Sequence, residues 1–187
     1  MTIYHMIDWF FMFSFIGYLI ECTVLSIENH RPVLNRGFGH GPFCIIYGFG
    51  ALFACMILAP VADQPVKLYF ASSMLATTME LVTAHVMIHF FGEFWWNYSK
   101  KPFNYKGIIC LESSIGWGFL GLFFFAVLRN LVHSLVYMVP QRAEKYLAIG
   151  LVLFYLLDFV YCFYSRLNGE EEEAEEGKEV IGRMKVN

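Results

Sequence analysis

Long apolar runs follow one another along this chain of 187 residues, and polar residues gather between them. A helix that crosses a bilayer needs about 20 consecutive, mostly apolar residues. Five segments are long enough, and we expect each of them to be a transmembrane helix. They lie at residues 3–27, 42–60, 68–91, 108–131 and 144–164.

The composition also indicates lipid as the solvent. Hydrophobic residues make up 58% of the chain and charged residues 16%, whereas about 25% of a typical soluble domain is charged. We therefore predict an all-α, polytopic membrane protein with about five transmembrane helices. The formal net charge of −3 does not indicate a nucleic-acid partner.

The chain divides into two parts by charge. Residues 1–167 form the predicted transmembrane helical domain, and residues 168–187 hold a run of glutamates. A segment with high charge and few apolar residues cannot bury enough surface to fold. We therefore expect a disordered, cytoplasmic acidic tail. The N-terminus lacks the basic region of a signal peptide and carries Asp8, so we expect it to be a retained first helix.

The positive residues predict an orientation. Five spans place the termini on opposite sides, and the side richer in Lys and Arg faces the cytoplasm. The loops after the first and third spans share a side with the C-terminus, and this side carries Arg31, Arg36, Lys100, Lys101, Lys106 and Arg166. The other side carries Lys67, Arg142 and Lys145, and Arg129 is ambiguous. We expect a multi-pass protein of the bacterial inner (cell) membrane, with its N-terminus outside and its C-terminus cytoplasmic.

Four acids lie inside the predicted spans, and a charge at the centre of a span costs at least about 2.5 kcal/mol. They are Glu21, Glu80, Glu112 and Asp158, and the single deep base is His85. Small residues at helical spacing accompany these acids, so we expect them to face other helices or a cavity rather than lipid.

Two interpretations of the acids remain open. Their carboxyl groups either stabilise helix packing as protonated or hydrogen-bonded groups, or line a cytoplasm-facing cavity for a cation, a proton or a substrate amine. In the second case Glu80 is the natural proton carrier, because burial favours its neutral form. We then expect Glu80, Glu21 and Glu112 to converge beneath the loops that carry Arg36 and Lys106.

Two loops mix glycine, aromatic and basic residues, at 28–41 and 95–107. Such loops are either interfacial anchors, since Trp and Tyr gather at the headgroup level, or structured loops that contact a ligand or partner, since glycine allows close approach. The candidate contact residues in and beside them are Asn35, Arg36, His40, Tyr47, Trp96, Tyr98, Asn104 and Lys106.

A weak repeat connects these features. An acid, an asparagine, a basic residue with glycine, and a glycine–aromatic–glycine triplet occur twice in this order. The first copy runs from Glu21 to the triplet at 48–50, and the second from Glu80 to the triplet at 116–118. The order either marks two parallel repeats related by an axis along the membrane normal or is a coincidence.

The sequence predicts no cofactor, metal or catalytic residue, and we do not expect an enzyme. No phosphate-binding P-loop occurs, and the five cysteines form no CxxC pair, so we expect them to be small buried hydrophobes. His85 and His89 share a helix face but have no evident third ligand.

The two loop regions together carry a family resemblance. Residues 35–38, 41–42 and 46–50, followed by 96–99, 102–104, 107–111 and 114–118, resemble the signatures of the type IV, CmpB-like ABC-transporter permease family. The resemblance covers about residues 8–130 and leaves out the fifth span and the tail. It implies a permease subunit that requires a separate ATPase. Because five helices enclose little space, a homodimer is a further expectation.

We thus expect a transporter permease subunit with a carboxylate-lined, cytoplasm-facing cavity and a separate energising partner. The alternative is a non-transporting membrane scaffold or regulatory protein whose two loops bind a partner or membrane lipid.

Overall fold

The computed structural model describes residues 2–34, 37–94 and 96–184, with the side chains of 141, 167 and 169–184 left out. Helices and short helical turns make up most of this part. The helices are α1 (Ile3–Glu28), α2 (Ile45–Phe53), α3 (Pro65–Phe91), α4 (Leu111–Phe123), α5 (Arg129–Tyr137) and α6 (Gln141–Met184). Two π-helical turns, η1 (Ala54–Leu58) and η3 (Phe124–Leu128), and one 3₁₀ turn, η2 (Ala59–Val61), continue α2 and α4.

Four helical segments in the described part are long and apolar enough to cross a membrane. They are Ile3–Glu28, Pro65–Phe91, Leu111–Tyr137 and Arg142–Arg166. A fifth apolar segment, Ile45–Val61, is shorter and lies at the lower end of the length that spans a bilayer, about 17 to 25 residues. These segments confirm the all-α, polytopic class. The residues at which each span enters and leaves the membrane stay a prediction.

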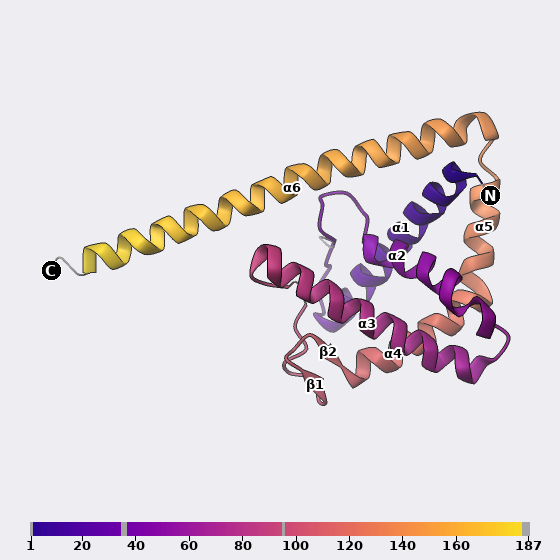
Figure 1. The fold of residues 1–187 in the computed structure, drawn as a ribbon, viewed down its shortest axis with the longest axis horizontal. Helices are drawn as coiled ribbons and strands as arrows, with labels where there is room; N and C mark the ends of the chain where they lie inside the picture. Colours follow the sequence, from indigo (N-terminus) through magenta and orange to yellow (C-terminus); the bar gives the residue numbers. More distant parts are fainter. Residues whose placement is uncertain (1, 35–36, 95, 185–187) are drawn as a thin grey trace.

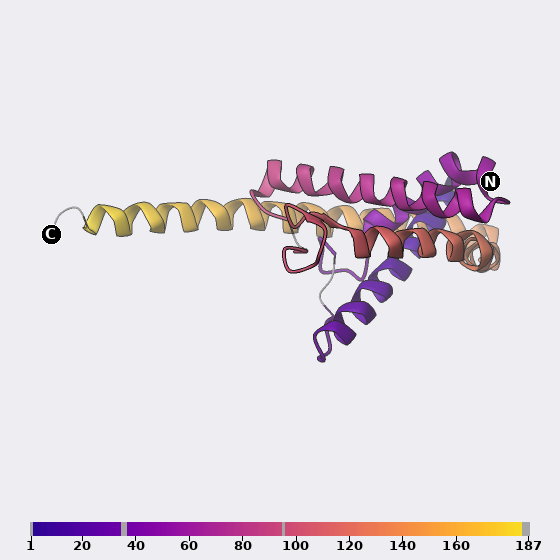
Figure 2. The ribbon, with the colours of Figure 1, turned by 90° about the horizontal axis from the view of Figure 1, so that it is seen from below.

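The helices form two hairpins and a long final helix (Figures 1 and 2). α1 packs against α2, and α3 packs against α4. The linkers of both hairpins lie at one end of the bundle, which we call the loop end. The N-terminus and the α5–α6 connection lie at the opposite end, so α6 begins beside α1 and runs toward and beyond the loop end.

Local sequence signals explain where several helices begin and end. Thr2 accepts a hydrogen bond from the backbone N–H of His5 and caps α1, as a short polar residue does at a helix start. α3 begins at Pro65 and ends before Gly92, whose φ of 67° is left-handed. Proline at the first position and glycine after the last are the usual pair of helix limits.

Glycines let the helices of each hairpin approach closely. A Cβ on Gly48 of α2 would lie 2.5 Å from Ser14 Oγ of α1, and one on Gly118 of α4 would lie 2.5 Å from the Tyr69 ring of α3. A Cβ on Gly50 or Gly116 would meet no atom within 4 Å. Gly48 and Gly118 therefore occupy equivalent positions in the two hairpins, because each faces the first helix of its hairpin. A superposition of the predicted triplets 48–50 and 116–118 would instead pair Gly50 with Gly118.

The two hairpins share further features. The backbone N–H of Cys44 donates to Ser14 O at 3.0 Å in the first hairpin. In the second, Ser73 Oγ donates to Ser114 O at 2.7 Å. Each second helix continues into a π-helical turn, η1 or η3. These two hydrogen bonds run in opposite directions between the first and second helix, so the π-helical turn is the shared feature that favours two parallel repeats. Superposition of the hairpins by a rotation about the membrane normal stays a prediction.

The main hydrophobic core lies between α1, α2, η3 and α5. Its buried side chains are Trp9, Phe13, Ala51, Phe124, Val132 and Val136. The chain changes direction at η3, so that α5 turns away from the axis of α4 and packs on α1 (Figure 1). π-Helical turns commonly mark such bends.

The backbone of residues 168–184 is helical and belongs to α6, where the sequence predicts a disordered extension. Glutamate, which is frequent in this segment, is a strong helix former. The division of the chain into residues 1–167 and 168–187 stays a prediction.

Candidate functional site

Glu80 is buried in the middle of α3, with 5% of its surface exposed. Its Oε1 accepts a hydrogen bond from the Tyr98 hydroxyl at 2.9 Å, and its Oε2 accepts one from Trp117 Nε1 at 3.2 Å. Within the described residues, Glu80 forms no ion pair with Lys or Arg. The carboxyl group is thus held by two neutral donors.

Glu21 of α1 is connected to Glu80 through two aromatic side chains, Tyr47 and Trp117. Its Oε1 accepts a hydrogen bond from the Tyr47 hydroxyl at 2.8 Å, and the Tyr47 ring lies 6.0 Å from the Trp117 ring, edge to face. A Cβ on Gly17 would lie 2.2 Å from the Tyr47 ring, so this glycine makes room for the tyrosine. The structure therefore brings Glu21 and Glu80 into one assembly with Tyr47, Tyr98 and Trp117, which we call the carboxylate cluster.

Tyr98 reaches the cluster from the linker between α3 and α4. Its backbone N–H donates to Gly107 O at 2.8 Å, and Trp96 Nε1 donates to Ile108 O at 2.7 Å, so both ends of the linker are tied together. Burial, followed by the charge of Glu80 and the hydrogen bond to it, raises the pKa of Tyr98. The tyrosine therefore stays a neutral hydroxyl across the physiological range.

The other candidates in this linker hold its turn. Strands β1 (Asn104–Tyr105) and β2 (Ile109–Cys110) pair antiparallel, and the Asn104 side chain donates to Lys101 O at 2.8 Å and accepts from Gly107 N at 3.1 Å. Lys106 Nζ lies 5.5 Å from the Tyr105 ring centre. We call residues 96–110 the linker hairpin. These contacts are internal to it.

Glu112 lies apart from the cluster, so the expectation that three carboxyl groups converge is wrong for this residue. It occupies the first turn of α4, where its side chain is 62% exposed. Lys101 Nζ lies 2.9 Å from Glu112 and 2.9 Å from Glu28, and these two acids raise the lysine pKa. At the start of α4 this acid is therefore paired with a base. Asn35 and Arg36, the other predicted loop contacts, lie outside the described residues.

Asp158 of α6 and His40 of the α1–α2 linker are in contact where α6 passes the loop end of the bundle. His40 Nδ1 lies 3.1 Å from Asp158 Oδ1, and the backbone N–H of Gly41 donates to Asp158 Oδ2 at 3.0 Å. Cys162 Sγ lies 3.1 Å from the same His40 Nδ1. Asp158 thus connects the α1–α2 linker to α6, and it is not part of the carboxylate cluster.

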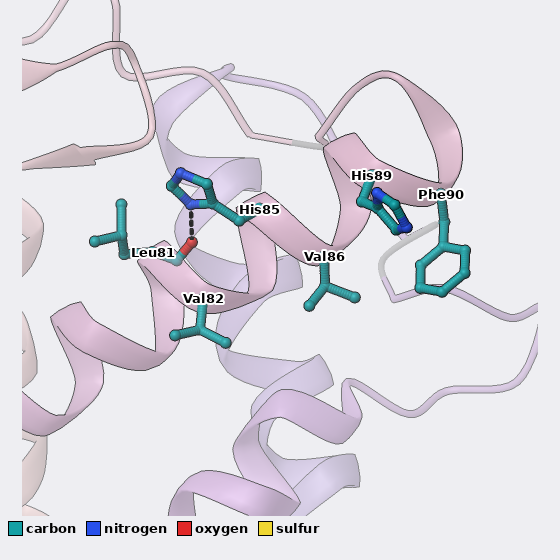
Figure 3. A pocket seen from close by; sticks show the side chains of 6 residues that line it. All are labelled: Leu81, Val82, His85, Val86, His89 and Phe90. Atoms are coloured by element: carbon teal, nitrogen blue, oxygen red, sulfur yellow. Dashed lines mark hydrogen bonds between the residues drawn. The ribbon is translucent and has the colours of Figure 1, made fainter.

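His85 also lies outside the cluster, on the surface of α3 (Figure 3). Its Nδ1 lies 2.7 Å from Leu81 O, one turn earlier. The hollow beside it, of about 470 Å³, is lined by six residues of α3 alone: Leu81, Val82, His85, Val86, His89 and Phe90. A second hollow lies at the linker hairpin. Neither hollow is lined by Glu21 or Glu80, whose surroundings are filled by aromatic side chains.

A second polar cluster, at the opposite end of the bundle, was not predicted from the sequence. Glu144 of α6 is 2% exposed, and it accepts a hydrogen bond from Thr2 and contacts His5. Asp8, 5% exposed, has no hydrogen-bond partner for either oxygen among the described residues. The spacing of His5 and Asp8, which places both on one helix face, was the available signal, but Glu144, which contacts His5, is distant in sequence.

Apolar helices of membrane-crossing length, packed around hydrogen-bonded carboxyl groups, define the class: an integral, multi-pass α-helical membrane protein. The family model described as "Putative ABC-transporter type IV" matches residues 8–163. The chain belongs to this family. The match includes nearly all of the fifth predicted span, which the resemblance of residues 8–130 left out. No curated protein and no solved structure matches the chain.

Proposed function

We propose that this protein is the membrane subunit of an ABC-type transporter and that Glu80 takes up a proton or the cationic group of a substrate. The observation that carries the proposal is the environment of Glu80, which is buried in a membrane helix and held by two neutral donors. An ionised carboxylate in this position is expensive. It is stable when protonated or when a cation binds beside it.

The two donors make the two oxygens different. Trp117 Nε1–H can only donate, so Oε2 must remain an acceptor. The Tyr98 hydroxyl can donate or accept, so it can reverse its hydrogen bond when Oε1 carries a proton. The cluster can therefore hold Glu80 in both protonation states without moving a heavy atom, as a proton-carrying group requires.

Access to Glu80 would come from the loop end. Tyr98 covers Oε1 and belongs to the linker hairpin rather than to a helix. Withdrawal of this hairpin would open a polar cavity lined by Glu80 and Glu21 toward the loop end, which we place in the cytoplasm. The structure then corresponds to a closed arrangement of the cluster.

Energy would come from a separate ATPase subunit that binds at the loop end. We place the protein in the bacterial inner membrane, in contact with lipid and as a homodimer, with an outside N-terminus. The alternative function, a scaffold or regulatory protein, is favoured by one feature of the linker hairpin: Phe103, directly before β1, is 83% exposed. A partner or membrane lipid could be held there without transport.

Glu80→Gln tests the role of Glu80. We would measure thermal unfolding of the purified protein in mild detergent, against pH and against alkali, primary-amine and quaternary-amine cations. A ligand at 100 times its Kd stabilises the folded state by about 2.7 kcal/mol. We expect protons or one cation class to stabilise the wild type in this way and Glu80→Gln to lose the response. The amide can keep its oxygen toward Trp117 and its NH₂ toward Tyr98, so the variant should fold.

Glu112→Gln is the matched control, because this carboxyl group is exposed and paired with Lys101. It should respond like the wild type. An equal response in Glu80→Gln and the wild type, or no response to any cation or pH in the wild type, would show that Glu80 is a packing element.

A further inference from the structure

We propose that His40, Asp158 and Cys162 form a binding site for a divalent transition-metal ion of the Zn²⁺ type. Each residue offers one ligand atom, and these atoms all lie within 4.8 Å of one another. The site is separate from the carboxylate cluster and does not depend on the function proposed for Glu80.

The distances between the ligand atoms fit a tetrahedral ion. His40 Nδ1 lies 3.1 Å from Asp158 Oδ1 and 3.1 Å from Cys162 Sγ, and the last two atoms are 3.7 Å apart. With Zn–N and Zn–O bonds of about 2.0 Å and a Zn–S bond of about 2.3 Å, tetrahedral ligands lie about 3.3–3.6 Å apart. Small side-chain movements would therefore place all three atoms around one ion.

The fold supplies the orientation that a metal site needs. Asp158 and Cys162 are one turn apart on α6 and face the same way. The Gly41 backbone N–H binds Asp158 Oδ2 at 3.0 Å, which leaves Oδ1 for the ion. A Cβ on Gly39 would lie 2.0 Å from Asp158 Oδ2, so a larger residue there would displace the carboxyl group. Contacts of this kind hold metal ligands in place.

The donor set indicates the class of ion. One nitrogen, one sulfur and one oxygen favour Zn²⁺ and similar ions over Mg²⁺ or Ca²⁺, which prefer oxygen ligands. The His40 side chain is 72% exposed, whereas that of Asp158 is 12% exposed. The site therefore lies at the surface, on the side where His40 is exposed. A bound ion would connect the α1–α2 linker to α6 at the loop end.

Zinc titration of the full chain in detergent tests the site, with a chromogenic chelator as competitor and Co²⁺ as a spectroscopic probe. We expect one Zn²⁺ per chain and a thiolate-to-cobalt charge-transfer band. Loss of groups outside the ligand shell already weakens binding about 10- to 100-fold. Cys162→Ser and His40→Ala should therefore each weaken Zn²⁺ binding by at least about 100-fold, and Cys162→Ser should abolish the band.

Cys55→Ser is the control, because it also removes one thiol but lies in η1, outside the site. It should bind like the wild type. His40→Ala changes a mostly exposed side chain, so it tests the site even if Cys162→Ser does not fold. The proposal is overturned if the wild type binds no stoichiometric Zn²⁺, or if His40→Ala binds as tightly as the wild type.

Discussion

At the scale of single residues, the close packing of the two hairpins depends on which atoms lie opposite each glycine. Gly48 and Gly118 face the neighbouring helix of their hairpins, whereas Gly50 and Gly116 face open space. The sequence presents all four in similar glycine–aromatic surroundings. Their different roles follow from the faces that α2 and α4 turn toward α1 and α3.

Alanine substitutions should separate these two kinds of glycine. In Gly48→Ala and Gly118→Ala the new methyl group would overlap the facing helix, and overpacking typically costs about 1–3 kcal/mol of unfolding free energy. In Gly50→Ala and Gly116→Ala the methyl group meets nothing, and helix propensity should raise the unfolding free energy by up to about 1 kcal/mol. Thermal unfolding in detergent measures both effects. Equal effects at Gly48 and Gly50 would contradict the packing described here.

At the scale of elements, the linker hairpin combines two roles. Its inner side carries Tyr98 to Glu80. Directly before β1 it exposes Phe103, which adopts a left-handed φ of 51°, a conformation that a bulky residue holds only when its surroundings impose it. Because this exposed residue is apolar and held in a fixed conformation, we expect it to bind a partner.

Phe103→Ser tests this expectation. Affinity purification from the native membrane in mild detergent should recover an ATPase subunit with the wild type and several-fold less of it with Phe103→Ser. Met138→Ser is the control, because Met138 is 77% exposed but lies at the opposite end of the bundle. The thermal stability of both variants should match the wild type. If the ATPase is recovered equally with Phe103→Ser, Phe103 is a lipid anchor. If no ATPase is recovered with the wild type, the scaffold function gains support.

At the scale of the whole molecule, the two ends of the bundle differ in chemistry. The loop end holds the linker hairpin, the Lys101 ion pairs and the His40–Asp158 contact. The opposite end holds Asp8, His5 and Glu144, which are buried between α1 and α6. The surplus of Lys and Arg at the loop end predicts that this end is cytoplasmic.

Reporter fusions after Asn187 test the orientation. We expect a reporter that is active only in the cytoplasm to be active there, and one that is active only in the periplasm to be silent. Fusions in the α2–α3 connection, at Asp63, should give the opposite pattern. Periplasmic activity after Asn187 would reverse the orientation and place Glu21 in the outer half of the membrane.

The sequence alone determined the class of protein, the family and the approximate positions of the apolar helices. Hydropathy is a local property, so a run of about 20 apolar residues identifies a span without knowledge of its neighbours. The cost of a charge in lipid likewise identified Glu21 and Glu80 as residues that face the protein interior. The loop motifs carried the family resemblance for the same reason, since each is contiguous in the chain.

The tertiary structure alone decided which polar groups meet. Glu80 accepts hydrogen bonds from Trp117 of α4 and Tyr98 of the linker hairpin. Glu112 instead forms an ion pair with Lys101 at the surface. His40 contacts Asp158, which lies 118 positions later in the sequence. Glu144 of α6 accepts a hydrogen bond from Thr2 at the start of α1. Hydropathy and spacing do not encode these pairings, because each depends on how far a helix is rotated about its axis and where its neighbours pack.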